Sequence, residues 1–114
     1  MAKFEAELTG DFNRILSQIE EAVLSRSASS SLEEKSDFVS GDSRCAVRVY
    51  ERYSYSGGNR VSMSITLFSQ GERIFVSAIT SGGSQAMLFK INTLGEETFL
   101  ETVTDILRKY KVYK

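Results

Sequence analysis

Histidine is absent from this chain of 114 residues. Histidine is the side chain most often used for acid–base catalysis near neutral pH. Its absence excludes His-based catalytic triads and zinc sites built from cysteine and histidine. Proline is absent as well, so no helix is interrupted by a proline ring and no turn contains a cis-prolyl bond. We therefore predict no metal site and no cofactor, and we rank an enzyme behind the binding functions.

Cysteine, net charge and long apolar runs are also scarce. The lone Cys45 cannot form an internal disulfide, and no histidine is present to activate its thiol, so an inert core residue is expected. No run approaches the roughly 18 apolar residues of a membrane span, and the acidic start Met1–Glu5 does not resemble a signal peptide. The formal net charge of −1 makes nucleic acid an unlikely partner. These features predict a cytoplasmic protein without a membrane segment.

Composition and length fit a single domain over residues 1–114. Hydrophobic residues make up 41% of the chain and charged residues 25%, which is ordinary for a soluble globular domain. Disorder is therefore not the default expectation.

The segment Val61–Thr80 predicts a β-hairpin. Apolar residues alternate with Ser62, Ser64 and Thr66, which is the period-2 pattern of a strand with one buried face. If Gln70-Gly71 is a two-residue loop, every cross-strand pair on that face is apolar: Leu67 with Ile74, Ile65 with Val76, and Met63 with Ala78.

The preceding strand, around residues 44–55, has two possible faces, and the loop length decides between them. A three-residue loop over Gly57-Gly58-Asn59 turns Cys45, Val47, Val49, Tyr53 and Tyr55 toward the core. A two-residue loop would turn the arginines inward instead, so we reject it. Arg48, Tyr50 and Arg52 are then expected on the opposite face.

The remaining pattern supplies the other elements. We predict a strand at Lys3–Leu8, an amphipathic helix over about residues 11–25 after capping oxygens in Thr9–Asp11, and a weak edge strand within residues 26–39. A short strand at Ala86–Ile91 and a helix starting at Thr93, with Glu96 in capping-box spacing, follow. The fold class is α+β: an antiparallel meander sheet of about five strands with two helices on one face, ordered β-α-β-β-β-β-α, as a two-layer sandwich.

Two surfaces are candidate sites. Glu51, Tyr53 and Tyr55 suggest a ligand pocket in a sheet–helix crevice, although an inward carboxylate more often marks a strand end or bulge that reaches water. The sheet face away from the helices mixes arginine and aromatic residues, which is typical of a protein interface. Its expected members are Arg48, Tyr50, Arg52, Phe68, Phe75 and Ile79. A solvated face is the alternative there.

Four segments resemble a small bacterial single-domain family of unknown function. They are CAVRVYERYS (Cys45–Ser54), GGNRVS (Gly57–Ser62), SAITSGGSQA (Ser77–Ala86) and FKINTLGE (Phe89–Glu96). The resemblance implies a single α+β domain and names no catalytic residue. The leading hypothesis is a non-enzymatic cytoplasmic module that forms a homo-oligomer or binds a protein partner, and the alternative is a small-molecule-binding protein.

Overall fold

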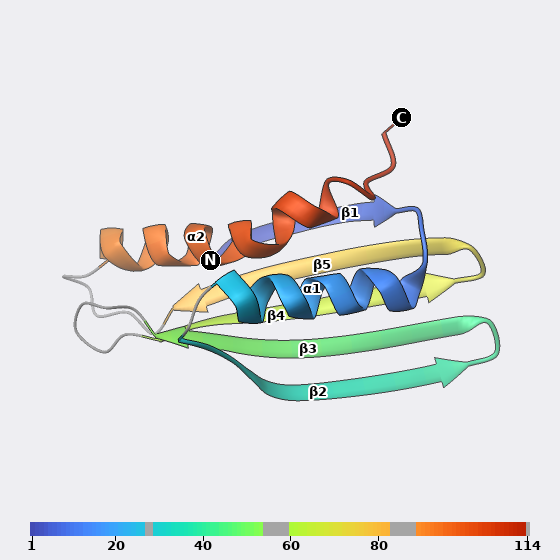
Figure 1. The fold of residues 1–114 in the computed structure, drawn as a ribbon, viewed down its shortest axis with the longest axis horizontal. Coiled ribbons are helices and arrows are strands. Elements are labelled where there is room, and N and C mark those ends of the chain that lie inside the picture. The colour runs from blue at the N-terminus through green and yellow to red at the C-terminus, as the bar shows by residue number, and fades with distance from the viewer. Residues whose placement is uncertain (27–28, 54–59, 83–88, 114) are drawn as a thin grey trace.

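Five antiparallel strands form one sheet, and two helices cover one of its sides, as Figure 1 shows. The structure is a computed structural model that describes the chain apart from residues 27–28, 54–59, 83–88 and 114, and apart from the side chains of residues 89–94. The elements are β1 (Ala2–Leu8), α1 (Phe12–Arg26), β2 (Ser30–Ser40), β3 (Ser43–Tyr53), β4 (Arg60–Gln70), β5 (Arg73–Gly82) and α2 (Phe89–Leu107). The predicted α+β class and element order are confirmed.

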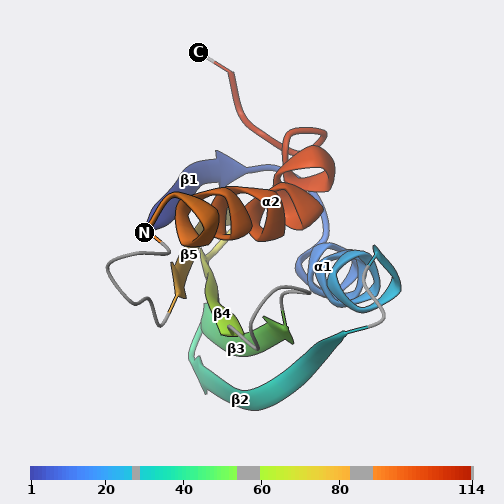
Figure 2. The ribbon, with the colours of Figure 1, turned by 90° about the vertical axis from the view of Figure 1, so that its left-hand side faces the viewer.

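The strand order across the sheet is β1-β5-β4-β3-β2, so the first strand lies beside the last one. The sheet curves around the two helices in Figure 2. We call the side that faces the helices the inner face and the opposite side the outer face. Both helices pack by the apolar stripes that the sequence predicts: Ile15, Ile19 and Val23 from α1, and Phe99, Val103 and Leu107 from α2 are all buried.

The start of α1 is set by Asp11. Its Oδ2 atom accepts a hydrogen bond from the backbone N–H of Arg14 over 2.9 Å, which satisfies one of the amides that a helix leaves free in its first turn. The predicted capping role of this segment is confirmed.

The hairpin of β4 and β5 keeps its predicted faces but not its predicted register. Leu67 lies opposite Val76 and Ile65 opposite Ala78, and Gln70 pairs with Arg73. The turn is therefore Gly71-Glu72, where Gly71 adopts φ +59, a left-handed conformation that glycine reaches without strain. The expected pairing of Leu67 with Ile74 is wrong by two residues, a shift that leaves every side chain on its predicted face.

The faces of β3 are the reverse of the prediction. Tyr50 lies opposite Met63 and Arg48 opposite Ile65, and both partners belong to the buried core. Arg48 and Tyr50 are thus on the inner face, as is Arg52 opposite Val61. The register expected from a three-residue loop is also wrong, because Tyr53 pairs with Arg60, and the expected loop over Gly57-Gly58-Asn59 lies outside the described residues.

Arginine can lie on the inner face because its aliphatic stem packs against apolar side chains while its guanidinium group bonds to polar atoms. Arg48 is only 8% exposed, and it donates to the backbone oxygens of Ser36 and Val47 and pairs with Asp37 over 3.1 Å. Arg52 donates to the carbonyl oxygen of Gly95 and stacks 4.8 Å from the centre of the Phe99 ring. Each inner guanidinium therefore has its own acceptors.

The helix α2 begins earlier than predicted. It starts at Phe89, so Thr93 lies inside the helix and cannot cap it, and the short strand expected over Ala86–Ile91 is wrong where it is described. The buried Glu96 carboxylate accepts a hydrogen bond from Gly82 N over 2.8 Å instead of closing a capping box.

The edge strand predicted within residues 26–39 is present as β2. It pairs along its length with β3 and carries a register irregularity between Leu32 and Glu34, which is a β-bulge in character. Its residues from 33 to 40 are exposed on both faces. No helix in the described part of the chain is long and apolar enough to cross a membrane.

Candidate functional site

The outer face of the sheet carries a row of apolar side chains that runs straight across four strands. Register pairing places Phe38 of β2 beside Cys45 of β3, Cys45 beside Phe68 of β4, and Phe68 beside Phe75 of β5. We call these four residues the aromatic row. The rings of Phe68 and Phe75 are stacked, with centroids 6.5 Å apart, an arrangement that contributes beyond simple burial.

Solvent reaches this row because neither of the two described helices covers the outer face. Phe38 is 66% exposed and Phe68 36% exposed, and Cys45 and Phe75 are half-buried. The expectation that Cys45 lies in the core is therefore wrong: its neighbours in space are the aromatic side chains of adjacent strands. Exposed apolar residues that adjoin one another form a patch, and such patches mark contact sites.

Polar side chains close one end of the aromatic row. Glu7 of β1 lies opposite Phe75, and its carboxylate accepts two hydrogen bonds from Arg73, over 3.1 and 3.2 Å. The Arg73 guanidinium also lies 5.0 Å from the centre of the Phe75 ring. Hydrogen bonding to Glu7 and its negative charge raise the pKa of Arg73, so this exposed guanidinium stays charged and can orient a partner at the rim.

A second row, next to the aromatic one, is small and rich in hydroxyl groups. It runs from Ser36 through Val47 and Thr66 to Ser77, and it ends at Glu5. Ser77 Oγ donates to Glu5 Oε2 over 2.9 Å. Because these side chains are short, the outer face is hollowed beside the aromatic row.

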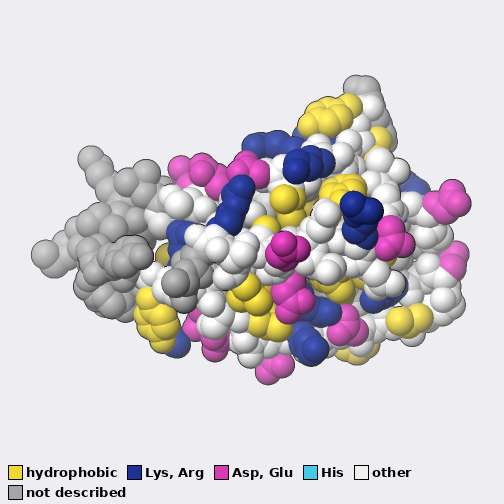
Figure 3. Space-filling view, in the orientation of Figure 1, with side chains coloured by type: hydrophobic (Ala, Val, Ile, Leu, Met, Phe, Trp, Pro, Cys, Tyr) yellow, Lys and Arg dark blue, Asp and Glu magenta, His cyan; other side chains and the backbone are white. Residues whose placement is uncertain are grey.

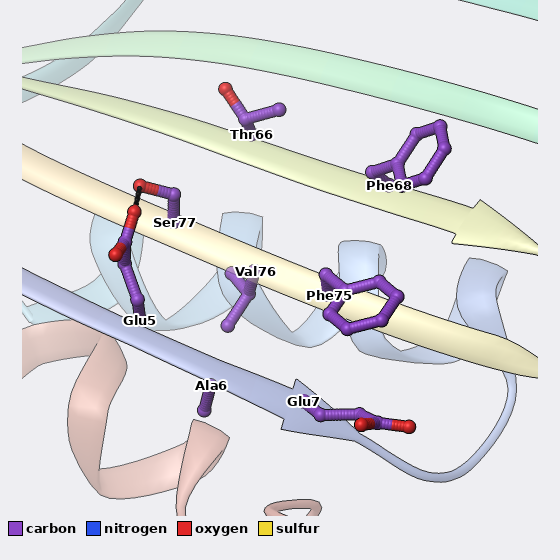
Figure 4. Close-up of a pocket in the computed structure, with 8 residues that line it drawn as sticks. All are labelled: Glu5, Ala6, Glu7, Thr66, Phe68, Phe75, Val76 and Ser77. Carbon is purple, nitrogen blue, oxygen red and sulfur yellow. Dashed lines mark hydrogen bonds between the residues drawn. The ribbon is translucent and has the colours of Figure 1, made fainter.

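Figure 4 shows this hollow, with Thr66, Phe68 and Phe75 on the side of the sheet away from the helices, which lie behind it. Its volume is about 460 Å³, and it lies over β1, β5 and β4. An open hollow with one aromatic wall and one hydroxyl-bearing wall suits the side chains of another protein surface better than an enclosed ligand.

A third row mixes apolar and polar side chains and runs from Glu34 through Val49, Ser64 and Ile79 to Lys3. Val49 pairs with Ser64, and Ser64 pairs with Ile79, which is 39% exposed. Phe68, Phe75 and Ile79 thus lie on the outer face, where the sequence predicts them. The structure adds four residues to this face: Phe38, Cys45, Val47 and Val49. The sequence does not place them there, because the predicted faces of β3 are reversed and the signal for β2 is weak.

The residues of the expected crevice do not line one. Glu51 is on the outer face opposite Ser62, where it forms an ion pair with Arg60 over 3.2 Å and accepts a hydrogen bond from Ser62 Oγ. Tyr53 is 48% exposed, and its hydroxyl accepts a hydrogen bond from Arg60 over 2.7 Å. Tyr55 lies outside the described residues. Glu51 and Tyr53 form a polar cluster at the end of β3, on the side of the sheet away from the helices.

The helix side has a hollow of similar volume, about 420 Å³, but charged and polar side chains such as Arg14, Gln18 and Glu21 take part in its lining. Figure 3, drawn with the helices toward the viewer, shows acidic and basic side chains interspersed over them. Such mixing gives no large field of one sign for steering a charged ligand. The outer face is therefore the candidate functional site.

Comparison with known proteins adds one finding. A model described as a family of unknown function (DUF6054) matches residues 1–111. Comparisons with the curated proteins and with the solved structures found no match.

Proposed function

Since the chain belongs to the DUF6054 family, whose function is unknown, we propose from its surface that it is a non-enzymatic cytoplasmic module that self-associates through the outer face of its sheet. The aromatic row carries this proposal. An apolar row that crosses four strands and ends at an exposed Phe38 has no cover in the described part of the chain, and burying it removes apolar area from water.

The second copy suits this face by shape. Two sheets that pack face to face lie about 10 Å apart, so protruding rings need a shallow region opposite them. A two-fold axis in the plane of the sheet that runs above the row of Thr66 and Ser77 places this row over its own copy, and the aromatic row over the row of Val49 and Ile79 in the other copy. The short side chains of Thr66 and Ser77 at the centre let the two sheets approach, so the rings can contact Val49 and Ile79. The same surface thus supplies both sides of the contact, as an isologous contact requires.

The non-enzymatic and cytoplasmic parts of the proposal have separate support. The lack of histidine removes the commonest general base near neutral pH. The lone cysteine is a free thiol, which is typical of a reducing compartment.

Analytical sedimentation tests the proposal. We expect the wild type to sediment above the mass of one chain, and the Phe68→Glu, Phe75→Glu double variant to form a smaller species, because two carboxylates would be buried in the contact. The matched control is Leu24→Glu with Tyr113→Glu, which also replaces two exposed apolar side chains but away from the outer face.

Two results contradict the proposal. A wild type that stays monomeric at high concentration removes self-association. A Phe68→Glu, Phe75→Glu variant that keeps the mass of the wild type shows that the outer face is not the contact surface.

A further inference from the structure

The two edges of the sheet are unequal. At one edge, the chain that follows α2 lies along the end of β1: Val112 N donates to Glu7 O, and Thr9 N donates to Tyr110 O, each over 2.8 Å. At the other edge, no described strand lies beyond β2, which is eleven residues long and exposed on both faces from residue 33 to residue 40. A strand of this kind offers a row of free amides and carbonyls to another strand.

We propose that β2 pairs antiparallel with β2 of a second copy, with Ser36 on the two-fold axis. This inference rests on the proposed self-association and adds a second contact to it. The pairing joins two five-stranded sheets edge to edge into one continuous sheet. The partner strand is β2 of a second copy of this chain, because the positive and negative side chains along β2 can pair with those of another β2.

The β2–β3 turn determines which backbone groups of β2 are free. Ser40 pairs with Ser43 across the two-residue turn Gly41-Asp42, and the pair that closes such a turn is hydrogen-bonded. Alternate residues therefore point their N–H and C=O groups toward β3, and Lys35, Asp37 and Val39 point theirs to the open edge. Arg48 supports this assignment, since its guanidinium reaches the carbonyl oxygens of both Ser36 and Val47, which lie between the two strands.

Symmetry then limits the possible registers. In an antiparallel pair of identical strands, the two-fold axis is normal to the sheet, and one residue lies opposite its own copy. An axis at Lys35 places two ammonium groups together, and an axis at Asp37 or Glu34 places two carboxylates together. An axis at Ser36 instead places Lys35 opposite Asp37 of the second copy, twice by symmetry, and like charges are kept apart.

The surroundings of Lys35 favour this register. Lys35 lies directly opposite Arg48 within its own sheet, and no described carboxylate forms an ion pair with its ammonium group. The Asp37 carboxylate of the second copy also pairs with Arg48 of its own chain over 3.1 Å. It still supplies negative charge to Lys35, because its side chain is 45% exposed. Phe38, the most exposed member of the aromatic row, then lies beside the stem of Glu34 of the second copy, so the apolar surface continues across the junction.

Charged residues on an edge strand often block pairing, and the sequence of β2 argues against that role here. A blocking edge presents the same sign at positions that oppose one another, whereas Lys35 and Asp37 are of opposite sign and flank the axis. The irregularity between Leu32 and Glu34 lies at one end and leaves residues 34–40 regular.

The edge contact and the face contact are compatible. An axis normal to the sheet keeps both outer faces on the same side, and the proposed face contact has its axis in the plane of the sheet. Ser36 belongs to the same row as Thr66 and Ser77, so the two axes meet, and two perpendicular two-fold axes that intersect close as a tetramer. The edge contact can therefore be measured alone in the Phe68→Glu, Phe75→Glu background, where the face contact is removed.

Charge reversal tests the register. In that background, Lys35→Glu and Asp37→Lys are each expected to weaken the dimer about tenfold or more, because each turns two opposite-charge pairs into like-charge pairs. An equimolar mixture of the two variants is expected to form a heterodimer. In it, Glu at position 35 of one chain faces Lys at position 37 of the other. The unchanged Lys35 and the unchanged Asp37 form the second pair. Glu21→Lys, an exposed charge reversal on α1, is the control and should leave the dimer unchanged.

Cysteine cross-linking provides a readout that does not depend on charge. With Cys45 replaced by serine, Ser36→Cys is expected to form an intermolecular disulfide readily, because directly opposed residues in a non-hydrogen-bonded pair have Cα atoms about 4.5 Å apart. Ser40→Cys lies opposite Leu32 of the second copy in this register and should not cross-link. Far-ultraviolet circular dichroism of each variant confirms that it is folded.

The outcomes separate the two proposals. A monomeric wild type overturns the proposed function and the edge contact together. Two results overturn the edge contact and leave the face contact in place. In the first, the wild type assembles but the Phe68→Glu, Phe75→Glu double variant is already monomeric. In the second, the mixture of Lys35→Glu and Asp37→Lys forms no heterodimer. Faster cross-linking of Phe38→Cys than of Ser36→Cys overturns the register.

Discussion

Removing the hydroxyl group of Tyr50 should stabilise this protein. The Tyr50 side chain is 0% exposed, and it lies on the inner face between Leu32 and Met63 of the neighbouring strands. Among the described residues, its Oη atom has no hydrogen-bond partner. A hydroxyl that leaves water without gaining a partner costs about 1–3 kcal/mol. The Tyr50→Phe variant keeps the ring and its packing, so we expect the free energy of unfolding to rise by about 1 kcal/mol at neutral pH.

The effect should grow with pH. Burial, with a smaller contribution from the nearby Glu20 carboxylate, raises the pKa of Tyr50 to about 12, and Arg48 acts in the opposite direction. In the unfolded chain the hydroxyl has its ordinary pKa of 10.0. Between these values the unfolded state has released the proton and the native state has not, so stability falls as the pH rises. A difference of about two pKa units corresponds to about 3 kcal/mol, which the wild type loses by about pH 12 and Tyr50→Phe does not.

Urea unfolding at about pH 7 and about pH 11 measures both effects. The control is Tyr113→Phe, which removes the hydroxyl of an exposed tyrosine outside the core. A Tyr50→Phe protein that is less stable than the wild type at neutral pH would show that the hydroxyl has a favourable partner. A stability difference that stays constant between the two pH values would refute the assigned pKa shift.

Two further substitutions test the core and the first helix by urea unfolding. Leu67→Ala should lower the free energy of unfolding by about 2–5 kcal/mol because the side chain is 0% exposed. The control Thr66→Ala, on the outer face, should change the free energy of unfolding by less than about 0.5 kcal/mol. Similar losses for the two variants would contradict the assigned faces of β4. Asp11→Ala should cost about 1 kcal/mol through loss of the hydrogen bond to Arg14 N, and Asp11→Asn should retain most of the stability. Equal losses for the two Asp11 variants would argue for a charge effect instead of a cap.

Most elements could be predicted because their signals are local. The helices α1 and α2 bury side chains that recur at helical spacing, and β4 and β5 alternate cleanly between apolar and hydroxyl-bearing residues. Each pattern depends only on the geometry of one element. The exact turn between β4 and β5 was less accessible, because moving it by two residues preserves the faces and leaves apolar pairs in either register.

Only part of the candidate site could be predicted from the sequence. Phe68, Phe75 and Ile79 belong to strands whose faces are clear, so they could be placed on the outer face. Phe38 and Cys45 could not be joined to them, because their place in the aromatic row depends on three successive registers along the sheet. The arginines at every fourth position of β3 were the available signal, and charge alone suggested the wrong face.

The sequence by itself determined the order of β1, α1, β3, β4, β5 and α2 and the two faces of β4, β5 and both helices, since apolar periodicity within one segment is enough to decide these. Only the tertiary structure decided which face of β3 is buried. Cys45, Val47 and Val49 are more apolar than Ala46, Arg48, Tyr50 and Arg52, which lie on the inner face, so the apolar pattern alone favours burial of the wrong face. The choice depended on acceptors supplied by distant segments: the carbonyl oxygens of Ser36 and Gly95 and the carboxylate of Asp37 take up the guanidinium groups of Arg48 and Arg52. A buried charge is tolerated only where such partners exist, and no local pattern reveals them.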